Sequence, residues 1–287
     1  MPELPEVQTI VNDLKKKILN RRLVGFWSDT PRIFPKNKIS NLKNQIKDWR
    51  IVTIHRRGKN ILLQLARHKP YTLSSKLLVI HPKLTGRLEL IKSNKRHETW
   101  NKKKYYRAVF YFNDGLALAF RDVRKFGKII FGDKKKIESL PDLKNLGPDP
   151  LTQNFDVSIF RNIIKAEKRK IKLVLLDQEV IAGIGNIYSD EALWQAKIHP
   201  FKPSNQLTSR QLTNLYKAIR KVLNSSLSVR GSSLRDFRDT EGKEGGYIKI
   251  RKVYSRENLP CYRCGVKIKR IKMGVRSAHL CPKCQKL

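Results

Sequence analysis

The chain has 287 residues, a length typical of two domains, with or without a small appendage. Hydrophobic residues make up 40%, enough for a real core, and 62 Lys and Arg against 24 Asp and Glu give a formal net charge of +38. No apolar run reaches transmembrane length, the first residues lack a signal-peptide core, and no basic amphipathic segment has a broad apolar face. These features disfavour a membrane or secreted protein and favour a cytoplasmic, nucleoid-associated one that binds a polyanion, first of all DNA or RNA. The alternative explanation of the charge is a generally basic proteome.

The chain begins with Met1 and Pro2, and two carboxylates, Glu3 and Glu6, follow closely. Removal of Met1 would leave Pro2 as a secondary amine, with Glu3 beside it and Glu6 close by. A terminal amine has a pKa near 8 against about 10.4 for lysine, so roughly a tenth is free base at neutral pH and able to form a Schiff base. Pro5 suits a first helical turn, whose dipole would lower that pKa further, and apolar residues follow at helical spacing: Leu4, Val7, Val11, Leu14 and Ile18. The alternative is an ordinary surface helix whose Pro and Glu residues are start signals.

From this helix to about Gly132, short strands dominate. Gly58-Lys59-Asn60 is the predicted tip of a hairpin, and Asn113-Asp114-Gly115 is a turn signal. Many short strands with few helices predict a β-sandwich or barrel. The expected strands are Arg50 to Arg57, Ile61 to Leu65, Lys76 to His81, Leu84 to Ile91, Tyr105 to Phe112, Leu116 to Phe120 and Lys128 to Phe131.

The second half of the chain is predicted to be mainly helical. Gly147-Pro148-Asp149-Pro150 breaks any regular element, so we expect an N-terminal domain over residues 1–133 and a linker over 134–150. A helical domain over 151–248 follows, in which Thr208 and Gln211 predict a capping box. Gly231 to Gly246 holds four glycines and several charges, which predicts a mobile loop.

All four cysteines lie in the terminal module, residues 249–287. Cys261, Cys264, Cys281 and Cys284 form two Cys-x2-Cys pairs separated by 16 residues, the spacing of a structural zinc site. Two disulfides are the alternative, which a chain without an export signal makes unattractive. We therefore expect one structural zinc ion in a zinc ribbon.

Five stretches stand out in order along the chain: Pro2-Glu3-Leu4-Pro5-Glu6, Arg56-Arg57-Gly58-Lys59, Asp122-Val123-Arg124-Lys125-Phe126-Gly127, Ala182-Gly183-Ile184-Gly185-Asn186-Ile187-Tyr188, and the zinc ribbon carrying Arg276. Together they resemble the formamidopyrimidine-DNA glycosylase family of base-excision repair enzymes. Leu4 favours this branch, because the related endonuclease-VIII-like branch typically has Gly there. The resemblance implies an α+β multidomain fold: an N-terminal β-sandwich with a leading helix, a helix-two-turn-helix domain and a C-terminal zinc ribbon.

The resemblance also implies roles for the catalytic residues. Pro2 matches the nucleophile that forms a Schiff base with the sugar, and Glu3 the acid that helps open the sugar ring. Lys59 matches the residue linked to β-elimination, with a phosphate contact as the alternative. Arg276 matches the residue linked to δ-elimination and, taken alone, would be a phosphate clamp. Glu6 is grouped with the DNA-binding residues and is expected to help hold the site.

Further residues match DNA contacts of the family. Arg124 and Phe126 match two side chains that enter the opened duplex, although Phe126 read alone would be a core residue. Leu84 stands at the third such position, where Met is usual, and Tyr105 lies where the family commonly has histidines. Asn186, expected to cap a helix from Ile187, and Lys168 and Lys172 are candidate phosphate contacts; for the two lysines a solvated basic face is the alternative.

The expected activity is that of a bifunctional DNA glycosylase and abasic-site lyase. Its expected partner is double-stranded DNA with oxidised purines or abasic sites, bound by a monomer in a basic cleft between the domains. One rival is the same chemistry on oxidised pyrimidines. The other is a non-catalytic zinc-ribbon protein that binds damaged DNA. The presence of all four expected catalytic residues, Pro2, Glu3, Lys59 and Arg276, argues against this alternative.

Overall fold

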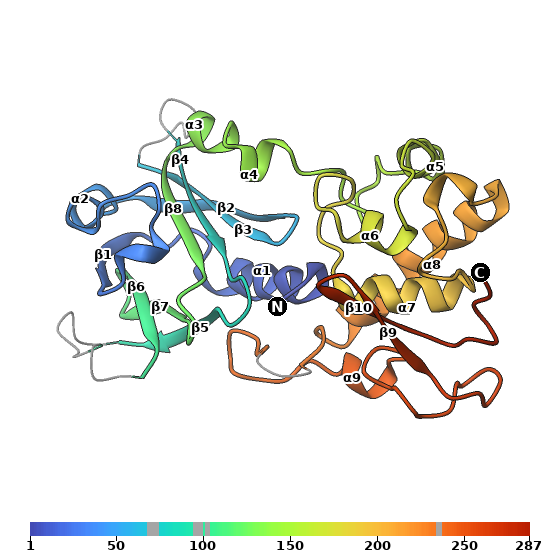
Figure 1. Ribbon diagram of the computed structural model, residues 1–287. Helices are drawn as coiled ribbons and strands as arrows, with labels where there is room; N and C mark the ends of the chain where they lie inside the picture. Colours follow the sequence, from blue (N-terminus) through green and yellow to red (C-terminus); the bar gives the residue numbers. More distant parts are fainter. Residues whose placement is uncertain (68–74, 94–99, 101–103, 234–236) are drawn as a thin grey trace. The chain divides into compact units, whose positions relative to one another are not determined.

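The computed structural model describes residues 1–67, 75–93, 100, 104–233 and 237–287 (Figure 1). It forms two compact units. The first comprises Met1–Lys144 together with Arg230–Gly245, and the second comprises Asn145–Val229 with Gly246–Leu287. None of the described helices is both long and apolar enough to cross a membrane.

This division differs from the predicted boundaries in two places. The expected linker over 134–150 contains two short helices, α3 (Lys134–Glu138) and α4 (Pro141–Lys144), and both belong to the first unit. The segment Arg230–Gly245 also belongs to the first unit, although it lies in sequence between helices of the second.

The first unit is a β-sandwich with a leading helix, as predicted. One antiparallel sheet has the order β2-β3-β4-β8 and the other the order β1-β6-β7-β5. Side chains from both sheets, such as Ile61, Leu63, Phe110 and Phe120, are buried in one common core. The strands are β1 (Leu23–Ser28), β2 (Arg50–Arg57), β3 (Asn60–Ala66), β4 (Ser75–His81), β5 (Arg87–Lys92), β6 (Tyr106–Phe112), β7 (Leu116–Arg121) and β8 (Lys128–Asp133).

Helix α1 (Leu4–Ile18) adds its apolar face to the same core. The helix begins where the sequence predicts, with Pro5 in the first turn and a capping box formed by Glu3 and Glu6. Two further elements precede β2: a single 3-10 turn, η1 (Pro31–Ile33), and the short helix α2 (Ile39–Gln45).

The second unit is helical and ends in a two-stranded hairpin. Its longest helix, α8, starts with the predicted capping box, in which the Thr208 hydroxyl accepts from the Gln211 amide. The C-terminal hairpin, β9 (Lys269–Met273) with β10 (Arg276–Leu280), lies between the two cysteine pairs. The remaining elements are α5 (Val157–Lys165), α6 (Ile171–Leu176), α7 (Asn186–Ala196), η3 (Ser204–Gln206), α8 (Ser209–Ser228) and α9 (Tyr247–Ile250).

Candidate active site and nucleic-acid interface

The start of α1 is held by a buried carboxylate. Pro2 and Glu3 are buried, and the Glu3 amide donates to Glu6 Oε2 at 2.8 Å. The other oxygen, Glu6 Oε1, accepts the backbone N–H of Ser232 at 2.7 Å. Because Glu6 is only 1% exposed and both its oxygens bind backbone amides, it does not fit the predicted group of direct DNA contacts. Its place in the structure is that of a residue that fixes the end of the helix.

The segment Arg230–Gly245 reaches Glu6 because it is tied to α1. The Arg230 guanidinium binds Asp13 of α1 at 2.7 Å and Asp239 at 2.6 Å. The chain turns at Gly231, whose φ of +87° is a backbone conformation that residues other than glycine rarely adopt. A Cβ at this position would lie 2.9 Å from Glu6 Oε1. Its described part is therefore anchored, in contrast to the mobile loop predicted from its glycines.

Lys59 lies at the hairpin tip between β2 and β3, as predicted, and is 5% exposed. The preceding residue, Gly58, has φ +57°. The Arg56 guanidinium donates to the Gly58 carbonyl and to the Gln8 side chain of α1, both at 3.0 Å. This bridge ties the turn that carries Lys59 to the helix that begins beside Pro2.

Leu84 and Phe126, two of the side chains predicted to enter the opened duplex, lie on neighbouring loops and are exposed. Leu84 is 39% exposed and Phe126 is 41% exposed, so the structure excludes the alternative that Phe126 is a core residue. The Arg124 guanidinium lies 4.8 Å from the centroid of the Phe126 ring. Strand β5 begins at Arg87, not at Leu84 as predicted, because residues 82–86 form a turn closed by a 3.0 Å bond from the Gly86 amide to the Pro82 carbonyl.

The Asp122 side chain binds both the loop that carries Leu84 and the loop that carries Phe126. Its role was not predicted from the sequence. Its fully buried carboxylate accepts the Gly127 amide at 2.7 Å, the Arg124 amide at 3.2 Å and the hydroxyl of Thr85, which adjoins Leu84. A signal was present in the sequence: an aspartate at the end of a predicted strand, two residues before a turn, readily accepts turn amides.

Tyr105 stands among cations. Its ring centroid lies 5.1 Å from Lys104 Nζ, 5.5 Å from the Arg121 guanidinium and 6.0 Å from that of Arg107. Its φ of +73° is strained for a bulky residue and marks the point where the chain enters β6. Tyr105, one of the predicted DNA contacts, therefore has its ring beside three cationic side chains.

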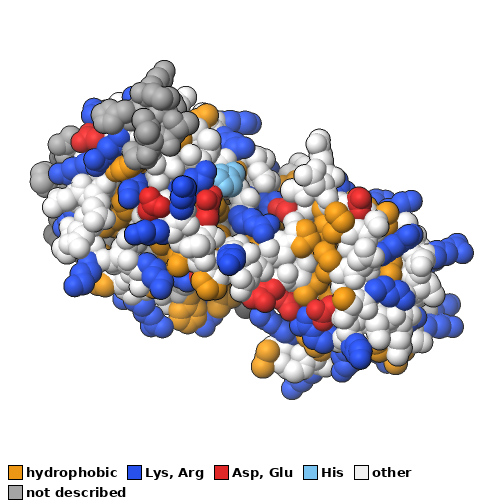
Figure 2. Space-filling view, turned by 90° about the horizontal axis from the view of Figure 1, so that it is seen from above, with side chains coloured by type: hydrophobic (Ala, Val, Ile, Leu, Met, Phe, Trp, Pro, Cys, Tyr) orange, Lys and Arg blue, Asp and Glu red, His pale blue; other side chains and the backbone are white. Residues whose placement is uncertain are grey.

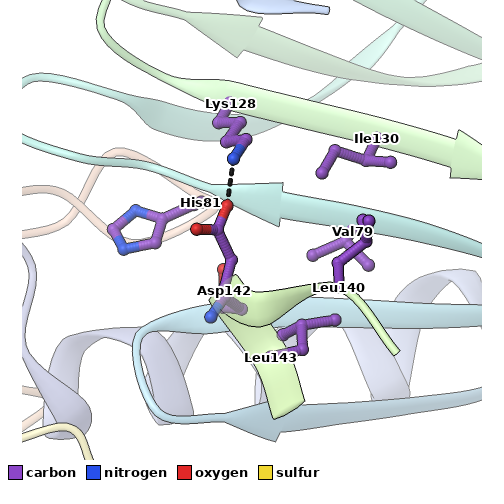
Figure 3. A pocket seen from close by; sticks show the side chains of 8 residues that line it. Val79, His81, Lys128, Ile130, Leu140, Asp142 and Leu143 are labelled. Carbon is purple, nitrogen blue, oxygen red and sulfur yellow. Dashed lines mark hydrogen bonds and ion pairs between the residues drawn. The ribbon is translucent and has the colours of Figure 1, made fainter. Parts of the chain in front are cut away.

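A small pocket lies beside the Lys59 turn (Figure 3). Lys128 and Asp142 form an ion pair next to His81, with an apolar wall of Val79, Ile130, Leu140 and Leu143. Burial, together with the nearby charges of Lys83 and Lys59, lowers the pKa of His81 to about 3, so its ring is neutral and Nδ1 accepts the Lys83 amide at 2.9 Å. The cavity of about 10 Å³ holds at most one water molecule, so it is no pocket for a flipped base.

In the second unit, the turn before α7 is pinned by Gln178. Its side chain donates to the carbonyls of Leu176 and Ile184, each at 2.8 Å, and accepts the Gly183 amide at 2.9 Å. Asn186 does not cap a helix from Ile187 as predicted. Gly185 is the cap and Asn186 is the first residue of α7, where its side-chain oxygen is buried without a hydrogen-bond partner among the described residues.

The two candidate phosphate-binding lysines differ sharply. Lys168 is exposed and stays a candidate. Lys172 is fully buried, and its ammonium lies 2.5 Å from Asp190, which is buried equally well. The prediction that Lys172 contacts phosphate is therefore wrong, because a charge enclosed with its counter-ion cannot reach DNA.

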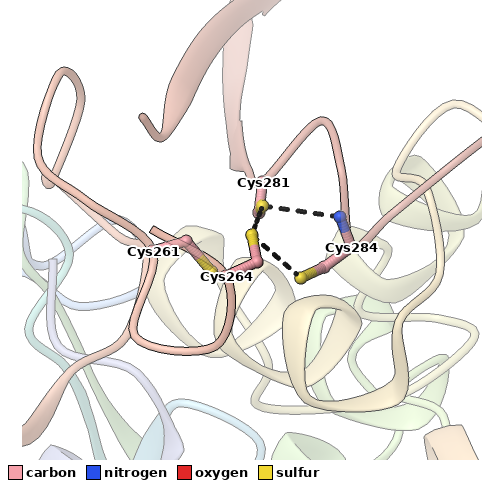
Figure 4. A group of neighbouring side chains, drawn as sticks. All are labelled: Cys261, Cys264, Cys281 and Cys284. Atoms are coloured by element: carbon pink, nitrogen blue, oxygen red, sulfur yellow. Dashed lines mark hydrogen bonds between the residues drawn. The ribbon is translucent and has the colours of Figure 1, made fainter. Parts of the chain in front are cut away.

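The four cysteines meet as the spacing predicts (Figure 4). Their sulfur atoms all lie within 4.8 Å of one another, and Cys264 Sγ is 3.4 Å from Cys281 Sγ and 3.5 Å from Cys284 Sγ. Zn–S bonds of about 2.3 Å in a tetrahedron separate the sulfurs by about 3.8 Å, so the set fits one zinc ion. The Trp194 indole and the Arg263 amide donate to Cys261 Sγ at 3.4 and 3.5 Å, as expected around a thiolate ligand.

Basic side chains are spread over the face of the molecule seen in Figure 2, among smaller areas of acidic side chains. Arg276, at the first position of β10, is exposed, and its neighbour Val275 is 99% exposed. The hairpin therefore presents an arginine at its tip. A cation so placed can contact a phosphate or a sugar hydroxyl.

The chain matches known proteins over its whole length. Three family models match it: the formamidopyrimidine-DNA glycosylase N-terminal domain at residues 1–129, the H2TH domain of that glycosylase at 146–238, and the zinc finger found in FPG and IleRS at 258–287. It is 37% identical to the formamidopyrimidine-DNA glycosylase of Pelotomaculum thermopropionicum over 287 residues, which cover 100% of both chains.

Solved structures give the same result. The Lactococcus lactis Fpg in complex with DNA containing an abasic site matches with a TM-score of 0.87 and 32% identity, over 99% of this chain and 100% of that one. The same enzyme with DNA containing FAPY-dG matches with a TM-score of 0.86 and 31% identity, over 99% and 100%. With its β-sandwich, helical unit and four-cysteine zinc site, the chain belongs to the formamidopyrimidine-DNA glycosylase family.

Proposed function

We propose that Pro2, Glu3, Lys59 and Arg276 carry the reaction of this bifunctional DNA glycosylase and abasic-site lyase, which removes oxidised purines in base-excision repair. The observation that carries the proposal is the start of α1. There Pro2 and Glu3 are buried together and Glu6 fixes the helix end through two backbone amides. A nucleophile and an acid must keep a fixed geometry, and this support supplies it.

The chemistry follows from the amine. After removal of Met1, the nitrogen lone pair of Pro2 attacks the sugar carbon that bears the damaged base, and the base leaves with the glycosidic electron pair. Glu3 donates a proton to the ring oxygen, the ring opens and an iminium ion forms. Loss of a proton from the adjacent carbon, assisted by Lys59, expels the 3′ phosphate. A second elimination, assisted by Arg276, expels the 5′ phosphate.

The DNA-binding roles belong to the same proposal. Phe126 and Leu84 would fill the gap left by the flipped nucleotide, with Arg124 at the orphaned base, while Tyr105, Lys168 and Asn186 would contact phosphates. We infer that the protein acts as a monomer in the cytoplasm, where it associates with the nucleoid. Zinc would hold the module that carries Arg276.

Borohydride trapping on DNA that contains an abasic site tests the nucleophile. The reagent reduces the iminium ion to a stable amine, so a covalent adduct should form, and peptide sequencing should place it at Pro2. A one-residue extension before Pro2 should abolish trapping, while Lys217→Ala, an exposed lysine of α8 outside the proposed site, should retain it. An adduct at Lys59 would overturn the assignment of Pro2, and no adduct at all would favour a non-catalytic damage-binding protein.

A further inference from the structure

Two successive carboxylates of α7 hold the zinc module from the inside of the second unit. Asp190 is 0% exposed and Glu191 is 1% exposed. Helix α7 and strand β10 contact each other directly (Figure 1). Neither carboxylate is near enough in sequence to a cysteine for the zinc motif to account for it.

Asp190 binds the hairpin strand that carries Arg276. Its Oδ2 accepts the backbone N–H of His279 at 3.0 Å and lies 3.0 Å from Nδ1 of the same residue. Its Oδ1 lies 2.5 Å from the buried ammonium of Lys172 on α6. One carboxylate thus joins α6, α7 and β10, and His279 lies only three residues after Arg276 on the same strand.

Glu191 binds the chain that leads into the zinc module. Its two oxygens accept three consecutive backbone amides, from Lys252, Val253 and Tyr254, at 2.8, 2.8 and 2.9 Å. The Tyr247 hydroxyl donates an additional, longer hydrogen bond to Glu191 Oε2 at 3.4 Å. Entry to the module and its terminal hairpin are therefore fastened at adjacent residues of one helix.

We infer that Asp190 and Glu191, which we call the carboxylate clasp, are positioning residues that set where Arg276 stands. Zinc fixes the two knuckles to each other, yet it does not fix the module to the helical unit. Arg263 and Gln285 also tie the module to the end of α7 and the residues after it, through the carbonyls of Trp194 and Ile198. The clasp holds different parts of the module: the strand that carries Arg276, through His279, and the entry segment 252–254. Buried ion pairs rarely add stability over apolar side chains of similar volume, and a directional anchor is one reason to keep them. The inference rests on the proposed role of Arg276.

Two double variants separate anchoring from folding. Lys172→Met with Asp190→Asn and Lys172→Met with Asp190→Leu both remove the buried charges, so neither leaves an uncompensated ion. Only asparagine retains an oxygen that can accept the His279 amide. Substrate DNA with a preformed abasic site removes the glycosylase step, and the measured quantity is the fraction of product that has undergone β,δ-elimination.

If the clasp positions Arg276, the asparagine double variant should keep at least half of the wild-type fraction of β,δ-elimination product. The leucine double variant should fall at least threefold, towards the value of Arg276→Ala, while both bind one zinc and form the Pro2 adduct within about twofold of wild type. Asp177→Asn, which disturbs an exposed ion pair with Arg169 outside the clasp, is the matched control and should not change the fraction.

The outcomes distinguish the inference from the function on which it rests. If Arg276→Ala leaves the β,δ fraction unchanged, the proposed role of Arg276 fails. If Arg276→Ala lowers it but the two double variants give equal fractions, the clasp does not position Arg276. Should the leucine double variant lose zinc, Glu191→Met, which leaves no acceptor oxygen for the amides of residues 252–254, gives the second reading: an unchanged fraction in the zinc-bound variant also overturns the inference.

Discussion

Gly231→Ala should weaken the support of the active-site end of α1, and Gly242→Ala is its matched control. Both glycines have nearly the same backbone conformation, with φ +87° and +85°. A Cβ at position 231 would lie 2.9 Å from Glu6 Oε1 and 3.0 Å from Glu6 Cγ, whereas one at position 242 would have no atom within 4 Å. The pair therefore differs in the contact with Glu6 and not in backbone strain.

The magnitude follows from what must move. An alanine in the left-handed conformation costs about 1–2 kcal/mol at either position. At position 231 the Glu6 carboxylate must also shift, although it accepts backbone amides from Glu3 at 2.8 Å and Ser232 at 2.7 Å. Loss of one hydrogen bond to a charged group costs about 1.5–3 kcal/mol. We therefore expect roughly 2.5–5 kcal/mol for Gly231→Ala against about 1–2 kcal/mol for Gly242→Ala.

Two measurements check this expectation. Urea unfolding of the N-terminal unit should show the difference in stability, followed separately from the second unit because the two need not unfold together. The rate of borohydride trapping on saturating abasic DNA should fall about tenfold or more in Gly231→Ala, because the helix start is displaced, and change little in Gly242→Ala. Equal losses of stability, with trapping at the wild-type rate in both variants, would refute the view that Glu6 is fixed against Gly231.

Glu3→Gln should lower base excision on the order of 10²–10⁴-fold, the usual weight of general acid catalysis, while affinity for abasic DNA stays within a few-fold; an equal loss of both would make Glu3 structural. Cys261→Ser should release zinc and weaken DNA binding while circular dichroism and urea unfolding show the N-terminal unit still folded, and normal binding without metal would remove the zinc module from the interface. Lys168→Ala should flatten the log–log dependence of DNA affinity on salt by about one unit, whereas Lys172→Met should destabilise the protein by about 3–5 kcal/mol, because it leaves Asp190 buried without its cation. The folded state holds His81 neutral, with its pKa lowered from 6.5 to about 3, so the stability that this contributes is present above pH 6.5 and is lost as the pH falls from 6.5 towards 3. His81→Asn should make that decline in unfolding free energy shallower, and an unchanged decline would assign it to other groups, such as His55, whose pKa burial also lowers.

Local patterns in the sequence predicted much of the fold. Strand β2 spans Arg50–Arg57 as expected, because alternation of side chains is a property of the segment itself. Strand β1 was not predicted, since Gly25 and a register shift interrupt its pattern, and α2 was not predicted because Leu42 is its one buried side chain. The helices α3 and α4 had local signals that the linker prediction overlooked: Asp133 caps the first, and Pro141 opens the second.

The candidate site divides in the same way. Motifs of adjacent residues led to the prediction of Pro2, Glu3 and Lys59 as site residues, and they located the four cysteines, which do cluster. What the sequence could not reveal is which distant group meets them. Ser232 binds Glu6 across 226 positions, and Lys172 meets a carboxylate that is not marked as its partner by any motif. A lysine in a basic segment is read as exposed, and only tertiary packing shows otherwise.

The distribution of the buried charges connects these supports with the net charge of +38. Among the described residues, the buried acidic side chains are Glu3, Glu6, Asp13, Asp122, Asp149, Asp190, Glu191 and Asp239, whereas the buried basic ones are Lys59, Lys172 and Arg256. Several of these acids bind backbone amides next to proposed functional residues, as Glu6, Asp122 and Asp190 do. Acidic groups that are scarce in the chain are thus withdrawn from the surface, where each would repel phosphate. Burial of these carboxylates therefore adds to the excess of positive charge on the outer surface, whose field attracts DNA.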